Sequence, residues 1–185
     1  MSKKFIFLLE EPSMKEFLDG FLPKVLTSVW QWQCIPHQGK SDLEASIPKK
    51  LRGWNEPGVK FIVVRDQDSG NCKTIKNRLR TLCEEGRNTT VIIRIACREL
   101  ESWFLGNLQA VGNAFEIEKI AKLQVKEKYR DPDRLYNPSG ELKRLVPSYQ
   151  KLSGARAMGQ HLDLKGNVSK SFNVFVRAIQ NCIAE

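Results

Sequence analysis

Pairs of acidic residues follow three of the four segments that the sequence predicts as β-strands. Ligands of an open parallel sheet bind beyond the carboxyl ends of its strands, so we expect these acids to gather at one edge of the sheet. Carboxylates gathered in this way repel one another and raise each other's pKa unless a cation lies among them. The three pairs are Glu10-Glu11, Asp66-x-Asp68 and Glu99-x-Glu101.

The pair Asp66-x-Asp68 follows the apolar run FIVV. If the backbone stays extended, both side chains point to one side, about 6–7 Å apart along the chain. Mg²⁺ or Mn²⁺ is the expected cofactor, because these hard cations take oxygen ligands such as carboxylates. A competing interpretation is structural: Asp68 also suits a turn or a helix N-cap. Glu10 and Glu11 would likewise be favourable beside a helix N-terminus.

Basic residues and one histidine are further candidates for a site. A stripe of cations on the helix predicted over residues 72–84 would hold a polyanion, and Lys40 would touch a phosphate in the loop before another helix. His37 is a candidate acid–base group. The competing interpretations are solvated surface cations and a histidine that only forms hydrogen bonds. The candidates for nucleic-acid binding are Lys40, Lys73, Lys76 and Arg80.

The composition and the charge of the chain indicate what kind of partner it could bind. The 185-residue chain has a formal net charge of +9. Residues 121–185 hold 12 Lys and Arg against 6 Asp and Glu, a net charge of +6. Such a basic third fits a nucleic-acid partner, although basic proteins without an anionic ligand are also common.

The chain is expected to be cytoplasmic and to contact no membrane. Its five cysteines are widely spaced without a Cys-x-x-Cys pair, which favours reduced thiols in a cytosol over a disulfide framework or a zinc site. Its apolar runs are far shorter than the roughly 20 residues that a bilayer span requires.

Strands alternate with helices along the first 105 residues, which predicts an α/β fold with a mostly parallel central sheet of about four strands. A capping box from Ser13 to Glu16 would begin the first helix, and Pro23 would kink or break it. Residues 117–140 predict a surface helix followed by a loop. The expected strands are 3–9, 30–36, 61–68 and 89–97, and the other expected helices are 43–54, 72–84, 98–106 and 172–183.

Three other enzyme classes share parts of these patterns. Haloacid-dehalogenase phosphatases also place Asp-x-Asp after a strand, but Thr or Val normally follows, and here Ser69 does. Response-regulator receivers also gather acids at strand ends, but no Lys-Pro follows a later strand here. Gly39-Lys40-Ser41 resembles the end of a P-loop, yet the motif requires a glycine where Cys34 stands.

Several stretches together resemble an uncharacterised bacterial family, a domain of unknown function related to TOPRIM. A strand-one glutamate and a later Asp-x-Asp are similar to the TOPRIM domain of topoisomerases, primases and OLD-type nucleases. TOPRIM patterns commonly place Gly directly after that glutamate, whereas Glu11 stands here. The stretches are LLEEPSMKEFLDGFLPK, CIPHQGKSDLEASIPKKLRGW, VVRDQDSGNCKTIKNRL, RIACRELESWFLG and PSYQKLSGARAMGQHLDL.

The resemblance implies a TOPRIM-like three-layer core over residues 1–115 and a basic, mainly helical extension over residues 116–185, packed on the core. It implies that Glu10 acts as an acid–base group or as a metal ligand, and that Asp66 and Asp68 are metal ligands. Glu99 and Glu101 match an acidic pair of the related family that has no assigned role, and either of them could complete a second metal site. An ATPase encoded nearby and a role in phage defence are implied as well.

These expectations favour a Mg²⁺- or Mn²⁺-dependent nuclease, in which the metal stabilises charge on a phosphodiester. Two alternatives stay open. One is a non-catalytic TOPRIM-like binding subunit of an ATPase or nucleic-acid complex. The other is a small-molecule phosphatase that is phosphorylated on Asp66.

Overall fold

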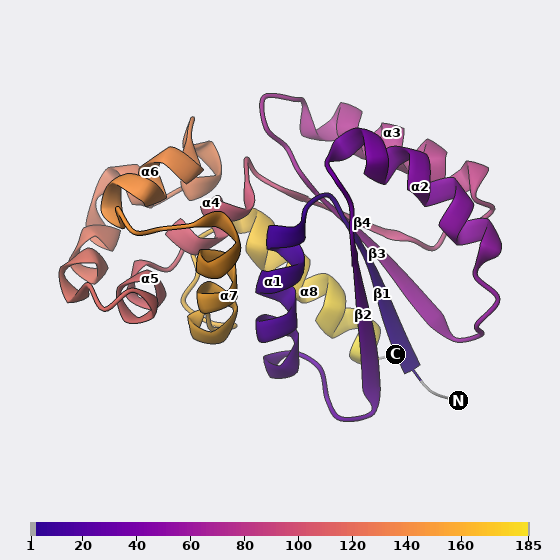
Figure 1. Cartoon of the computed structure of the whole chain (residues 1–185), viewed down its shortest axis with the longest axis horizontal. Helices are drawn as coiled ribbons and strands as arrows, with labels where there is room; N and C mark the ends of the chain where they lie inside the picture. The colour runs from indigo at the N-terminus through magenta and orange to yellow at the C-terminus, as the bar shows by residue number, and fades with distance from the viewer. Residues whose placement is uncertain (1–2, 185) are drawn as a thin grey trace.

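A four-stranded, all-parallel sheet lies at the centre of the fold (Figure 1). The structure is a computed structural model that describes residues 3–184. The strands lie side by side in the order β2-β1-β3-β4, which confirms the predicted α/β class with a parallel central sheet. The strands are β1 Lys3–Leu9, β2 Trp30–Pro36, β3 Val59–Asp66 and β4 Ile92–Ala96.

Helices cover both faces of the sheet (Figure 1). Because successive strand residues point to opposite faces, Ile6 and Leu8 of β1 pack with the helices α2 Lys40–Gly53 and α3 Cys72–Glu85. Phe5 and Phe7 pack in a larger core with α1 Pro12–Phe21 and α8 Lys170–Ala184. The three layers are therefore helices, sheet and helices.

The chain between β4 and α8 adds short helices to the larger core. Trp103 is fully buried there, stacked on Phe175 with ring centroids 4.9 Å apart and edge-on to Phe17 at 6.1 Å. Residues of this segment thus share one core with α1 and α8. Its elements are α4 Leu100–Leu105, α5 Leu108–Ala114, η2 Glu118–Val125, η3 Glu127–Tyr129, η4 Pro132–Arg134, α6 Pro138–Leu145 and α7 Lys151–His161.

Two local predictions were wrong. Residues 117–140 form three 3₁₀ turns and the start of α6 instead of one helix and a loop. The capping box is also absent: α1 begins at Pro12, a residue favoured at the first helical position, so Glu11 precedes the helix and Ser13 lies within it. The break expected at Pro23 is confirmed, since α1 ends at Phe21 and a 3₁₀ turn, η1 Leu22–Lys24, follows.

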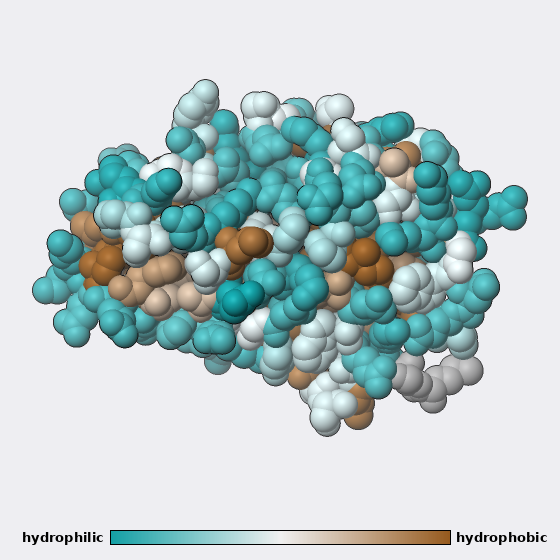
Figure 2. Space-filling view, viewed as in Figure 1, coloured by the Kyte–Doolittle hydropathy of each residue, from teal (hydrophilic) through white to brown (hydrophobic). Residues whose placement is uncertain are grey.

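The surface is mostly hydrophilic on the face drawn in Figure 2, where apolar residues gather in a few patches, the broadest of them toward the left end. Among residues 3–184, no helix combines the length and the apolar character that a membrane crossing requires.

A buried carboxylate ties η3 to α6. Glu141 accepts a hydrogen bond from Arg144 Nη2 at 2.7 Å and one from Lys128 Nζ at 2.6 Å, and it also pairs with the hydroxyl of Tyr129. The bond from Arg144 is the main reason that the pKa of Glu141 falls to about 2. Because the folded value lies below the roughly 4.3 of an unfolded glutamate, Glu141 stabilises the fold above that pH.

We therefore predict that this stabilisation is lost as the pH falls from about 4.3 toward about 2. Chemical denaturation across this range checks it: the free energy of unfolding should fall more steeply for the wild type than for Glu141→Gln. At pH 7 the variant should lose about 1–2 kcal/mol, because Arg144 and Lys128 are half exposed and solvent screens their attraction. Parallel pH curves for the two proteins would contradict the prediction.

Candidate functional site

Three carboxyl groups gather where β1 and β3 end and α4 begins. Glu10, Asp66 and Glu101 are 7%, 8% and 1% exposed, respectively. Leu9 pairs with Val64 in the sheet, which brings Glu10 beside the last residues of β3. Glu10 Oε2 accepts a hydrogen bond from the backbone N–H of Asp66 at 3.0 Å. The parallel register thus carries two of the predicted acids to one place.

Asp66 carries the least compensated charge of the three. Its Oδ1 is buried and has no hydrogen-bond partner among the described residues. Burial raises the pKa of Asp66 well above its usual range, and the nearby charges of Glu101 and Glu10 raise it further. A buried carboxylate that lacks a partner is costly, so this oxygen is where a cation would be stabilised most.

Glu10 and Glu101 are held by neutral donors. The hydroxyl of Tyr149 donates to Glu101 Oε1 at 2.9 Å, while Glu10 is held by the backbone of Asp66. Burial raises the pKa of both glutamates. Arg65 Nε lies 3.8 Å from Glu10 Oε2, too far for a hydrogen bond.

Lys151 is a cation close to the cluster, and the sequence did not indicate it as functional. It is the first residue of α7 and forms an ion pair with Glu11. Its charge lowers the pKa of Asp66 and of Glu101, against the larger effect of burial. Tyr149 and Lys151 both lie in the stretch PSYQK, whose similarity to a known family was the only sequence signal for them.

Glu99 plays a different part from Glu101. It is the N-cap of α4, where its side chain accepts from the backbone of Ser102, and its Oε2 also accepts from the N–H of Ser139 at 2.9 Å. Glu99 therefore joins the starts of α4 and α6, and the structure does not bring its two oxygens to Asp66 as free ligands.

Asp68 turns away from Asp66. The strand ends at Asp66, and Asp68 has a φ of 54°, so the extended geometry expected for the pair is wrong. The N–H groups of Gln67 and Asp68 both donate to the carbonyl of Arg98, at 2.8 and 2.9 Å, which holds this turn. The exposed carboxylate of Asp68 pairs with Lys40 at 3.2 Å.

The helix that follows this turn, α3, does not have Asp68 as its N-cap. Asn71, and not Asp68, is the N-cap of α3 and accepts from the N–H groups of Lys73 and Thr74. The structural alternative for Asp68 as an N-cap is therefore also wrong. Its observed partner is Lys40.

His37 lies inside the fold with both ring nitrogens engaged. Its Nδ1 lies 2.8 Å from the carbonyl oxygen of Leu9, and its Nε2 lies 2.7 Å from Ser46 Oγ. In this arrangement the imidazole fastens the end of β1 to α2. An acid–base role for His37 would require one of these contacts to open.

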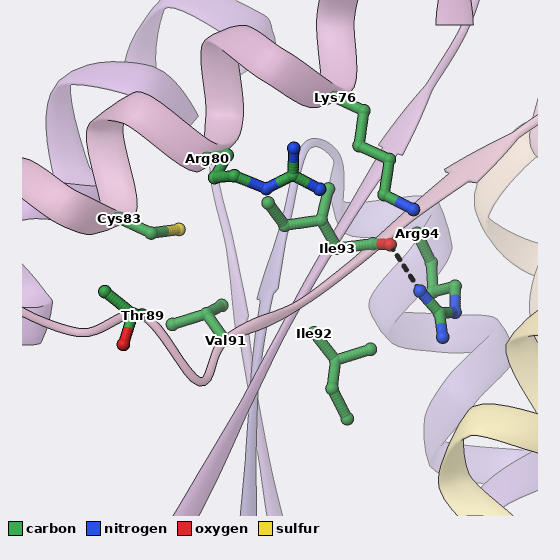
Figure 3. A pocket seen from close by; sticks show the side chains of 8 residues that line it. All are labelled: Lys76, Arg80, Cys83, Thr89, Val91, Ile92, Ile93 and Arg94. Carbon is green, nitrogen blue, oxygen red and sulfur yellow. Dashed lines mark hydrogen bonds between the residues drawn. The ribbon is translucent and has the colours of Figure 1, made fainter. Parts of the chain in front are cut away.

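Basic residues line a groove along β4, the edge strand beside α3. One cavity of about 260 Å³ is lined by Lys76, Arg80 and Arg94 (Figure 3). A second cavity of about 310 Å³ is lined by Lys73, Lys76, Arg94 and Lys170. We call these two cavities the β4 groove. Three of its cations are the residues that the sequence predicted to contact nucleic acid.

Arg94 lies in the β4 groove with spare hydrogen-bonding capacity. Its Nη1 donates to the carbonyl of Ile93 at 2.7 Å (Figure 3). Its Nε is buried and has no hydrogen-bond partner among the described residues. Burial lowers the pKa of Arg94. A partly desolvated guanidinium of this kind gains from an anion placed beside it.

The carboxyl cluster suits a hard cation in chemistry, although its ligands are not preassembled. Within residues 3–184, no three His, Cys, Asp or Glu side chains are already arranged to hold a metal ion. Glu10, Asp66 and Glu101 nevertheless supply oxygen atoms, which Mg²⁺ and Mn²⁺ prefer, and Asp66 Oδ1 is unpartnered. Coordination would require Glu10 and Glu101 to exchange their present hydrogen bonds for the ion.

Comparison with known proteins identifies a family but no activity. A sequence model of a family described as a domain of unknown function (DUF4276) matches residues 9–180. The match spans the carboxyl cluster, the β4 groove and Lys151. It provides no link to TOPRIM proteins or OLD nucleases. No curated protein and no solved structure matches the chain.

We predict that Asp66→Asn stabilises the protein when divalent ions are removed by a chelator. The substitution removes a carboxyl group whose ionisation is opposed by burial and keeps the side chain's shape, so the free energy of unfolding at pH 7 should rise by about 1–2 kcal/mol. Asp68→Asn is the matched control: its carboxylate is exposed, and the change should stay within about 0.5 kcal/mol. A loss of stability in Asp66→Asn would mean that its charge is already satisfied in the fold.

Proposed function

The chain belongs to the DUF4276 family, and we propose that it is a Mg²⁺- or Mn²⁺-dependent nuclease. The carboxyl cluster of Glu10, Asp66 and Glu101 would hold the ion, and the β4 groove would hold the nucleic acid. The observation that carries the proposal is the buried Oδ1 of Asp66, which has no hydrogen-bond partner within residues 3–184 and lies near two further buried carboxyl groups.

The bound ion would supply positive charge to a phosphodiester and lower the pKa of a water molecule. Burial raises the pKa of Glu10 in the ion-free protein, so Glu10 would give and take a proton only while it is not itself a ligand of the ion. The ammonium of Lys151 would attract the substrate phosphate toward the cluster. Tyr149 would keep Glu101 oriented through its hydrogen bond.

The β4 groove supports a polyanionic substrate. Several cations project into it from α3, β4 and α8, and the whole chain has a net charge of +9. Contacts between such cations and phosphates release counterions, so affinity for nucleic acid should fall steeply with salt. Lys40 is engaged with Asp68 and would have to leave it in order to bind phosphate.

A second candidate function is a non-catalytic subunit of an ATPase or nucleic-acid complex. It is favoured by Lys151, since a lysine ammonium already supplies part of the positive charge that the carboxylates require. In that case the cluster would be a buried polar network that positions α7 on α1, and a metal ion would have no place in it.

A calorimetric titration with Mn²⁺ separates the two candidates. The wild type and Asp68→Asn should both bind Mn²⁺, whereas Asp66→Asn should lose binding by at least about tenfold, because it removes a charged ligand. Lys151→Met, which keeps an unbranched side chain without the charge, should bind Mn²⁺ more tightly. Equal binding in the wild type and Asp66→Asn, or no binding in either, would favour the non-catalytic subunit.

Nucleic-acid binding is tested by the anisotropy of a fluorescent single-stranded oligonucleotide. Lys76→Ala and Arg80→Ala should each weaken binding, and each should reduce the slope of log affinity against log salt by roughly one. Lys119→Ala is the control, since Lys119 lies on η2, outside the β4 groove. Equal effects of all three substitutions would mean that binding is spread over the basic surface.

A further inference from the structure

Two thiols meet at the carboxyl-terminal end of the β4 groove. The Sγ atoms of Cys72 and Cys97 lie 3.2 Å apart, and both cysteines are free and partly exposed. Cys72 is the first residue of α3, and Cys97 directly follows β4. Both line the cavity of about 310 Å³, so a small molecule from solvent has access to the pair.

We propose that Cys72 and Cys97 form a peroxide-reactive dithiol that closes to an intramolecular disulfide. The sulfur atoms are already in contact, so a modest rotation of the two side chains brings them to bonding distance. The proposal is independent of the nuclease activity, because neither thiol belongs to the carboxyl cluster.

Cys72 is the residue that reacts first. It is the first residue of a 14-residue helix, and the positive end of the helix dipole lies beside it. Lys73, Lys76 and Lys170 line the same cavity and add positive charge, against the carboxylate of Asp133 in the same lining. Burial and the contact with Cys72 raise the pKa of Cys97, so Cys97 stays a thiol and acts second.

The reaction balances with a hydroperoxide as the oxidant. The sulfur of Cys72 attacks one peroxide oxygen, the O–O bond breaks, and the leaving hydroxide takes up the Cys72 thiol proton as water. The sulfur of Cys97 then attacks the sulfenic sulfur of Cys72, the S–O bond breaks, and a second water leaves with the thiol proton. Two thiols and one hydrogen peroxide thus give one disulfide and two waters.

The disulfide would fasten two segments that flank the carboxyl cluster. The turn from Gln67 to Asn71 leads into Cys72, and the carbonyl of Arg98, next to Cys97, accepts the N–H groups of Gln67 and Asp68. Oxidation would therefore add a covalent link to a turn that hydrogen bonds hold in the reduced protein.

The test is peptide mapping of the purified full-length chain after exposure to hydrogen peroxide. Free thiols are alkylated at successive times, and the protein is digested and analysed by mass spectrometry. We expect a Cys72–Cys97 cross-linked peptide, a mass loss of two hydrogen atoms, and recovery of both thiols with dithiothreitol. Under peroxide, Cys72 and Cys97 should become unavailable to the alkylating reagent about tenfold faster than Cys34. Cys34 is a partly exposed thiol beside Asp19.

Two variants sharpen the test. In Cys72→Ser, Cys97 should remain open to alkylation, because the thiol that reacts first is gone. In Cys34→Ser, the Cys72–Cys97 disulfide should form at the wild-type rate. The proposal is overturned if Cys72 and Cys97 react no faster than Cys34, or if they become separate sulfinic acids. Disulfides between molecules on a non-reducing gel would overturn it too. These outcomes are all readable in the wild type, so a variant that fails to fold leaves the test intact.

Discussion

The buried charge of Asp66 is the constraint on which the candidate site depends. Its carboxylate lies at the end of a central strand, near Glu10, Glu11 and Glu101, and one of its oxygens has no partner among the described residues. Desolvation and like charges both oppose ionisation there. Either a proton or a cation must therefore compensate the cluster, and Lys151 supplies only part of the required charge.

The fold brings this cluster together through distant parts of the chain. The parallel register of β1 and β3 places Glu10 at the backbone of Asp66. Glu101 arrives from α4 after β4, Tyr149 from the segment just before α7, and Lys151 from the first residue of α7, which packs against α1. A site assembled from four segments is positioned by the core that joins them, so the large aromatic core around Trp103 also serves the chemistry.

The sequence predicted the part of this arrangement that local patterns contain. Apolar runs gave the strands, and the rule for parallel sheets predicted that Glu10 and Asp66 would meet. The sequence left open whether Asp68 continues the strand or enters a turn, because the geometry there depends on the carbonyl of Arg98, a residue on another strand connection. Lys151 and the hydrogen bond from Ser139 to Glu99 were missed because the long-range packing of α7 and α6 leaves no periodic signal.

The most direct test of the cation site is a crystal of the protein soaked with Mn²⁺ and measured for anomalous scattering. A peak bonded to Asp66 Oδ1, together with an oxygen of Glu10 or Glu101, is the predicted result. It should disappear in a crystal of Asp66→Asn soaked in the same way. No peak at Asp66 in the wild type, with Lys151 still paired to Glu11, would contradict the claim that the cluster holds a metal ion.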